Sequence, residues 1–165
     1  MKKRVHASPF FTLAPLLLAG ALCMPGGVRA QNGELSRIAD DTRFNNAYYF
    51  VTMDMPEKAA LYLGEYIEVY QDGIHRKEAL MALGDIYYQK FEYERARSYY
   101  MMLFEEYPNT EQGVEAYYRS ALCFIKMGMP EKADAVFTDI VDNYPQYTAA
   151  ENARLQRDIE SMLDE

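Results

Sequence analysis

Apolar residues recur with helical spacing through the middle of the chain, in pairs of short segments separated by turn residues. Intervals of three and four residues place such side chains on one face of a helix. The clearest pair lies at residues 80–103. One face of its first helix carries Leu80, Leu83, Gly84 and Tyr87, and one face of its second helix carries Ala96, Tyr100 and Leu103. The pattern predicts two amphipathic helices joined by a short turn.

The paired segments return at a fixed interval. Residues 53–59 reappear at 127–133, 74 residues later, and half that step, 37 residues, superimposes Tyr107 on Tyr144. A fixed period of this length is typical of stacked helical repeats. We therefore expect an all-α fold with three helix pairs, at about residues 40–73, 77–110 and 114–147.

In each predicted pair, one position on the first helix and one on the second carry a small residue. A large side chain there would force paired helices apart, at a cost of roughly 1 to 3 kcal/mol. Close approach therefore explains Ala47, Gly84 and Ala121 on first helices and Ala59, Ala96 and Ala133 on second helices. Pro56 and Pro130 fit the first turn of second helices, where the missing N–H costs nothing.

A final helix is expected over residues 148–164. It has Ala149, Ala153, Ile159 and Leu163 on one stripe amid charged residues. A helix with a polar outer face is typical of the end of a solenoid, so this segment is interpreted as a capping helix.

These residues resemble the tetratricopeptide repeat, whose signature is a large residue, leucine, a small residue and an aromatic on the first helix, then alanine, an aromatic and a closing proline. The second unit follows it through to Pro108. The third reads Tyr117, Ser120, Ala121, Phe124, Ala133, Phe137 and Pro145, and the first is more degenerate, with Arg43, Asn46, Ala47, Phe50 and Ala59. The resemblance implies a right-handed solenoid that binds proteins or peptides.

In that family, ligands lie in a concave groove against the first helices. Carrying those positions over gives Phe44, Asn45, Tyr48 and Thr52 from the first unit, Met81, Asp85, Tyr88 and Gln89 from the second, and Tyr118, Arg119, Leu122 and Lys126 from the third. Aromatic and methionine side chains provide large, adaptable contact area. The alternative is that several of these rings pack against neighbouring helices.

The amino end reads as a secretory signal peptide. Lys2, Lys3 and Arg4 precede an apolar run over residues 10–24, which is too short to span a membrane. Pro25, Gly26 and Gly27 are expected to break the helix. Val28 and Ala30 suit a signal peptidase, so cleavage is expected after Ala30, which places a mature protein in the periplasm or outside the cell. Acylation of Cys23, as in a lipoprotein, is the alternative.

Charge excludes several classes of partner. Beyond residue 30 the chain carries 13 basic and 25 acidic residues, a balance of −12. Nucleic-acid affinity comes mainly from Lys and Arg on the phosphate backbone, so DNA, RNA and anionic lipid are not expected partners.

No motif supports catalysis, a metal or a cofactor. His75 is interpreted as a solvated linker residue, Cys123 as a buried inert thiol, and the acidic pairs Asp40-Asp41 and Glu105-Glu106 as solvated charges. An enzyme built on dispersed carboxylates such as Glu105 and Glu106 remains the alternative, but no small-molecule substrate is expected.

The sequence therefore predicts a non-enzymatic adaptor of the bacterial cell envelope, a monomer or weak homo-oligomer that binds a protein or peptide. The repeats and leader resemble the periplasmic repeat domain of the Tol-Pal coordinator family and the lipoprotein of the outer-membrane β-barrel assembly machine. A self-assembling structural component of an envelope complex is the rival interpretation.

Overall fold

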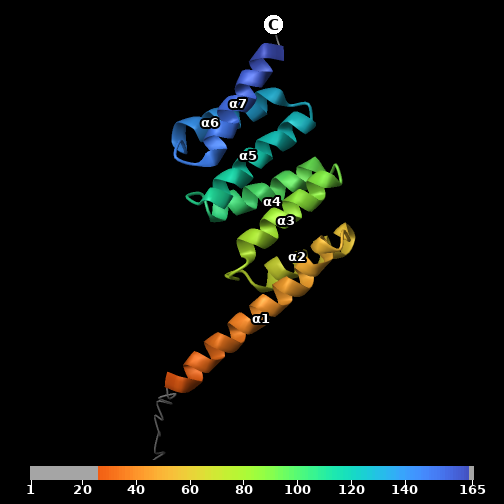
Figure 1. Ribbon diagram of the computed structural model, residues 1–165, viewed down its shortest axis with the longest axis vertical. Helices are drawn as coiled ribbons and strands as arrows, with labels where there is room; N and C mark the ends of the chain where they lie inside the picture. Colours follow the sequence, from red (N-terminus) through yellow and green to blue (C-terminus); the bar gives the residue numbers. More distant parts are fainter. Residues whose placement is uncertain (1–25, 164–165) are drawn as a thin grey trace, which may run out of the picture.

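Seven helices make up the regular structure of the part of the chain that the computed structural model describes, residues 26–163, with side chains from residue 33 to residue 162 except residue 160 (Figure 1). The helices are α1 (Gly26–Thr52), α2 (Pro56–Val69), α3 (Arg76–Gln89), α4 (Tyr93–Glu106), α5 (Glu111–Lys126), α6 (Pro130–Asn143) and α7 (Thr148–Leu163). None of them is long and apolar enough to cross a membrane.

The helices stack in series. Each packs against the next in sequence, and the first helices of successive pairs also contact one another, α1 with α3, α3 with α5 and α5 with α7. Figure 1 shows the pairs following one another along the length of the molecule. This confirms the predicted all-α fold, a helical-repeat solenoid of three pairs followed by a single helix.

Turns between paired helices share one backbone geometry. Asp54, Phe91 and Gly128 occupy the same register position and all have positive φ, at 52°, 62° and 72°. The helices that follow them start at Pro56, Tyr93 and Pro130, so both prolines lie in the first turn, as predicted. Only Gly128 has the residue type that adopts this conformation without strain.

The close-approach positions are buried as predicted. Gly84 is buried, and the five alanines at equivalent positions, Ala47, Ala59, Ala96, Ala121 and Ala133, are at most 1% exposed. At Gly84 even one added carbon would overlap the ring of Tyr100. The helices of the second pair therefore approach as closely as the absence of a side chain permits.

Helix α1 is longer than the predicted first helix, which was expected to start near residue 40. It begins at Gly26, so Gly26 and Gly27 lie in its first turn, and the leader segment that they were expected to break from lies outside the described residues. Residues 33–39 are all exposed. The rest of the expected leader, with Cys23, lies outside the described residues, and cleavage after Ala30 stays a prediction.

Helix α7 packs through the first part of the predicted stripe and not through Ile159. Ala149, Ala150 and Ala153 are buried, whereas Ile159 is 44% exposed. Ile159 was wrongly placed in the stripe because the packed side of α7 is narrow and is filled by its first turns. Arg157 forms an ion pair with Asp134 of α6, with 2.6 Å between Nε and Oδ1, at the polar end of the solenoid.

Candidate functional site

A hollow of about 500 Å³ lies between α3 and α5 on the face formed by the first helices. Six of the twelve predicted groove residues line it, Asp85, Tyr88, Gln89, Tyr118, Arg119 and Leu122, together with Tyr100 and Glu115. We call this set of eight residues the α3–α5 hollow. The repeat register thus brings the second and third units together as the sequence predicted.

An ion-pair network crosses the hollow. One oxygen of Asp85 accepts hydrogen bonds from the Tyr100 hydroxyl, at 2.6 Å, and from Arg119 Nη1, at 2.7 Å. Arg119 Nε donates to Glu115 Oε1 at 2.8 Å. Burial lowers the pKa of Arg119, but Asp85 and Glu115 raise it by more, so the guanidinium stays charged. These pairs hold α5 against α3 and fix the floor of the hollow.

Two tyrosines form its apolar walls. Tyr118 packs against Phe137, with ring centroids 5.5 Å apart, and Tyr88 meets the edge of Tyr93 at 5.4 Å. Both are partly buried, and burial raises the pKa of both phenols. Each ring therefore has one side in the core and the other facing the hollow. The alternative interpretation, that these rings pack against neighbouring helices, therefore also holds for Tyr88 and Tyr118.

Sequence reasoning missed Tyr100 and Glu115 as lining residues. Tyr100 belongs to the second helix α4, but its hydroxyl reaches Asp85 of α3. Glu115 stands three residues before Tyr118 and four before Arg119 on the same helix, so helical spacing was a usable signal for it.

The other predicted groove residues lie outside the hollow. Phe44 was wrongly predicted to line the groove, because it is only 7% exposed and belongs to the core. Its ring stacks on His75, with centroids 4.3 Å apart. Met81 packs against the same core, and Tyr48 stacks on Phe44. Exposed positions that line no part of the hollow are Asn45, Thr52 and Lys126.

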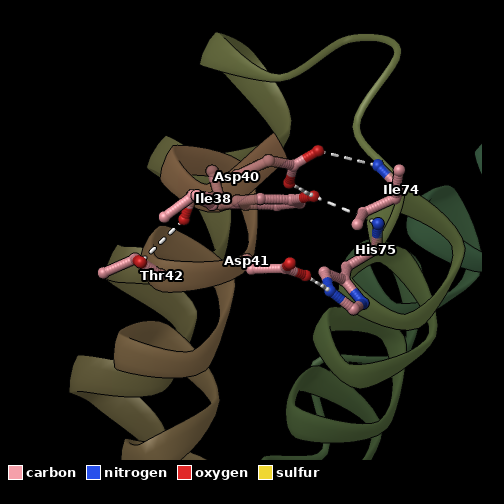
Figure 2. A network of polar contacts seen from close by, with 7 residues as sticks. Ile38, Asp40, Asp41, Thr42, Ile74 and His75 are labelled. Atoms are coloured by element: carbon pink, nitrogen blue, oxygen red, sulfur yellow. Dashed lines mark hydrogen bonds and ion pairs between the residues drawn. The ribbon is translucent and has the colours of Figure 1, made fainter. Parts of the chain in front are cut away.

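A polar network joins α1 to the start of α3 (Figure 2). The Tyr66 hydroxyl donates to Asp40 Oδ1, and Asp40 Oδ2 accepts from the backbone N–H of Ile74 at 2.8 Å. His75 Nε2 lies 2.6 Å from Asp41 Oδ1. Two predictions were therefore wrong: His75 is not a solvated linker residue, and Asp40, at 6% exposure, is not a solvated charge.

Glu106 is exposed, as predicted, but its ion pair with Arg76 was not predicted. Its two oxygens accept from Nε and Nη2 of Arg76, each at 2.7 Å, and Arg76 is only 8% exposed. Glu105 is exposed, as expected. Because Glu106 neutralises a nearly buried guanidinium, its role is structural.

Cys123 is fully buried, and burial raises the pKa of its thiol to about 12. The prediction that this thiol is buried is therefore confirmed, and a thiol that stays protonated is a poor nucleophile. Among the described side chains, no group of three or more His, Cys, Asp or Glu residues could hold a metal ion.

A stack of helix pairs with an open, partly apolar hollow on its first-helix face defines a scaffold of the helical-repeat class. Residues 78–110 and 115–147 match the sequence profile of the Tetratricopeptide repeat. The second and third helix pairs are thus similar to the tetratricopeptide repeat, a family of protein-interaction modules that are typically non-catalytic. No curated protein matches this sequence.

Proposed function

We propose that this protein is an exported, non-enzymatic adaptor of the cell envelope that holds a segment of a partner protein in the α3–α5 hollow. The observation that carries the proposal is the hollow itself. Two helices supply its tyrosine walls, and the fixed charges of Asp85 and Arg119 lie at its floor. Rigid aromatic surface around a few oriented polar groups is typical of protein-binding faces.

Export rests on the leader pattern. The basic residues Lys2, Lys3 and Arg4, the short apolar run and the small residues at Val28 and Ala30 have the order of a cleavable signal peptide. The likeness to the Tol-Pal coordinator repeats and to the barrel-assembly lipoprotein supports an envelope role of the same kind. Sequencing the amino terminus of the protein recovered from the cell envelope tests both the location and cleavage after Ala30.

The binding role is tested by placing a photoreactive amino acid at Leu122, in the hollow, and in a second protein at Leu61 of α2, which is 58% exposed. The Leu122 protein should crosslink a defined partner that the Leu61 protein does not. The purified partner should then bind the protein carrying Tyr88→Ala and Tyr118→Ala at least about tenfold more weakly, with helicity by circular dichroism nearly unchanged. Equal affinity of that double variant would contradict the proposal.

Self-assembly is a second candidate, favoured by one feature of α1. Leu35, Ile38 and Tyr49 lie at intervals that place them on one side of the helix, and each is more than half exposed. Light scattering over a range of concentrations tests this candidate. A mass that rises with concentration, and that Leu35→Ser with Ile38→Ser returns to that of a monomer, would favour assembly; a constant monomer mass would exclude it.

A further inference from the structure

We infer that the binding surface continues from the α3–α5 hollow across α7, and that it takes an extended polypeptide segment with apolar anchors and a basic flank. This inference rests on the proposed function and names the chemistry of its partner. It starts from the repeat register of α7, which the final helix keeps although no second helix follows it in the described residues.

Helix α7 repeats the geometry of α5. Both helices have 16 residues, and a step of 37 residues carries Glu111–Lys126 onto Thr148–Leu163. The backbone N–H of Thr148 donates to Glu111 Oε1 at 3.2 Å, which joins the two helix starts at matching positions. Helix α7 therefore stands where the first helix of a fourth pair would stand.

That register places three exposed apolar side chains on the groove side of α7. Leu155 corresponds to Tyr118 and Ile159 to Leu122, which both line the hollow, and Met162 lies one turn further on. Their exposures are 62%, 44% and 73%. The apolar surface of the hollow thus has a neighbouring stripe on the next first helix.

The side of α7 that would face a second helix of its own pair is polar rather than apolar. Tyr117, Ser120, Ala121 and Phe124 of α5 correspond to Arg154, Arg157, Asp158 and Ser161 of α7, which line a polar recess of about 710 Å³ with Pro130, Glu131 and Asp134. Burying these charges under a further helix pair would be costly. The apolar stripe is therefore not surface left for another repeat, and a ligand along the groove accounts for it better.

Charge identifies one flank of the partner. Asp41, Glu78 and Glu115 occupy one register position on α1, α3 and α5, so carboxylates recur along one edge of the first-helix face. Asp41 already contacts His75, and Glu115 already pairs with Arg119. Glu78 is exposed and forms no ion pair within the described residues, and the chain beyond residue 30 carries a balance of −12. The opposite edge has Gln89 and Lys126. A partner with Lys or Arg along one side only is complementary to this face.

Spacing suits an extended segment. Packed helices lie about 8 to 10 Å apart. An extended polyproline II segment rises about 3.1 Å per residue with three residues per turn, so every third side chain points the same way and meets the next first helix. The probe is accordingly a fluorescent peptide of about nine residues with leucine at every third position and a lysine after each leucine. Two matched peptides carry glutamate in place of lysine and serine in place of leucine.

Fluorescence anisotropy with the full-length protein measures the affinities. We expect the lysine–leucine peptide to bind at least about tenfold more tightly than either matched peptide. The protein carrying Leu155→Ser and Ile159→Ser should lose about tenfold for this peptide, whereas Leu61→Ser, a matched exposed leucine on α2, should have no effect. Glu78→Lys should weaken the lysine peptide and strengthen the glutamate peptide.

The outcomes separate this inference from the function on which it rests. If Tyr118→Ala weakens peptide binding but the α7 variant does not, the hollow stands and its continuation onto α7 is refuted. If neither variant changes the affinity, the hollow itself is not the site. Equal binding of all three peptides, no binding of the lysine–leucine peptide, or self-association that the α7 variant abolishes would each overturn the stated chemistry of the partner.

Discussion

The first and third helix pairs solve the same packing problem with opposite chemistry. In the third pair, Val114 of α5 and Ile140 of α6 are fully buried in one apolar cluster. Their counterparts in the first pair, 74 residues earlier, are Asp40 and Tyr66, which join α1 to α2 by a buried hydrogen bond. A repeat fold thus tolerates a polar pair at an apolar position when both groups find partners.

The same difference explains why the family profile matches the second and third pairs and not the first. The matched segments are the second and third pairs, where apolar side chains occupy the signature positions except at Ser120. The first pair has Arg43 and Asn46 at the positions of Leu80 and Leu83, and its polar junction departs further from the signature. It nevertheless packs in the same series, because α1 contacts α2 and α3 as the other first helices contact their neighbours.

Replacing Asp40 with valine, the residue at this position in the third pair, should have the largest effect on stability. Tyr66 is fully buried and would lose its acceptor, and Ile74 would lose the acceptor of its N–H. Stranding these donors should lower the free energy of unfolding by about 3 kcal/mol, measured by urea denaturation. Hydrogen exchange should locate the loss in α1 and α2 rather than in α5 and α6.

A matched double variant sharpens this test. Asp40→Val with Tyr66→Phe removes both members of the buried hydrogen bond while keeping the ring, so it should recover about 1 to 2 kcal/mol of the loss. A double variant less stable than Asp40→Val alone would show that the Tyr66 hydroxyl is held mainly by its contact with the backbone N–H of His75, and would contradict the pairing argued here.

The second pair differs from both in its closest contact, and Gly84 tests it. The Tyr100 ring against Gly84 is held by its hydrogen bond to Asp85, so it has little freedom to move aside. Gly84→Ala should therefore cost about 2 kcal/mol. The control is Gly64→Ala in α2, where an added carbon meets no atom within 4 Å and the better helix former should stabilise by up to about 1 kcal/mol. Equal thermal shifts would refute the close-approach argument.

Periodicity was enough to predict the pairs and much of the hollow. The 37-residue step places Tyr88, Tyr118 and Leu122 on first-helix faces that adjoin one another, since register in a solenoid fixes which residues become neighbours. The same step also carried information that was not used, because it aligns Leu155 with Tyr118.

The polar contacts could not be predicted in this way. Asp40 and Ile74 are 34 residues apart and meet only because the connection before α3 folds back on α1. Arg76 begins the first helix of the second pair and Glu106 ends its second helix, so these contacting residues are 30 positions apart in the sequence. Such partners depend on loop paths and side-chain directions that hydrophobic spacing does not encode. For that reason His75 and Asp40 were wrongly interpreted as solvated, and the pairing of Glu106 with Arg76 was missed.

The smallest effect is expected at His75, where it separates two contributions to the polar junction of α1. The Asp41 side chain is 49% exposed, so solvent screens its pairing with His75 and the pair should contribute well under about 1 kcal/mol. The ring stacked on Phe44 should contribute about 1 kcal/mol. His75→Ala should therefore lower the free energy of unfolding by about 1 kcal/mol, whereas His75→Phe, which keeps a ring and loses the contact with Asp41, should retain most of the stability. Urea denaturation of both variants decides the matter: if His75→Phe is as unstable as His75→Ala, the contact with Asp41 stabilises the junction and the stack does not.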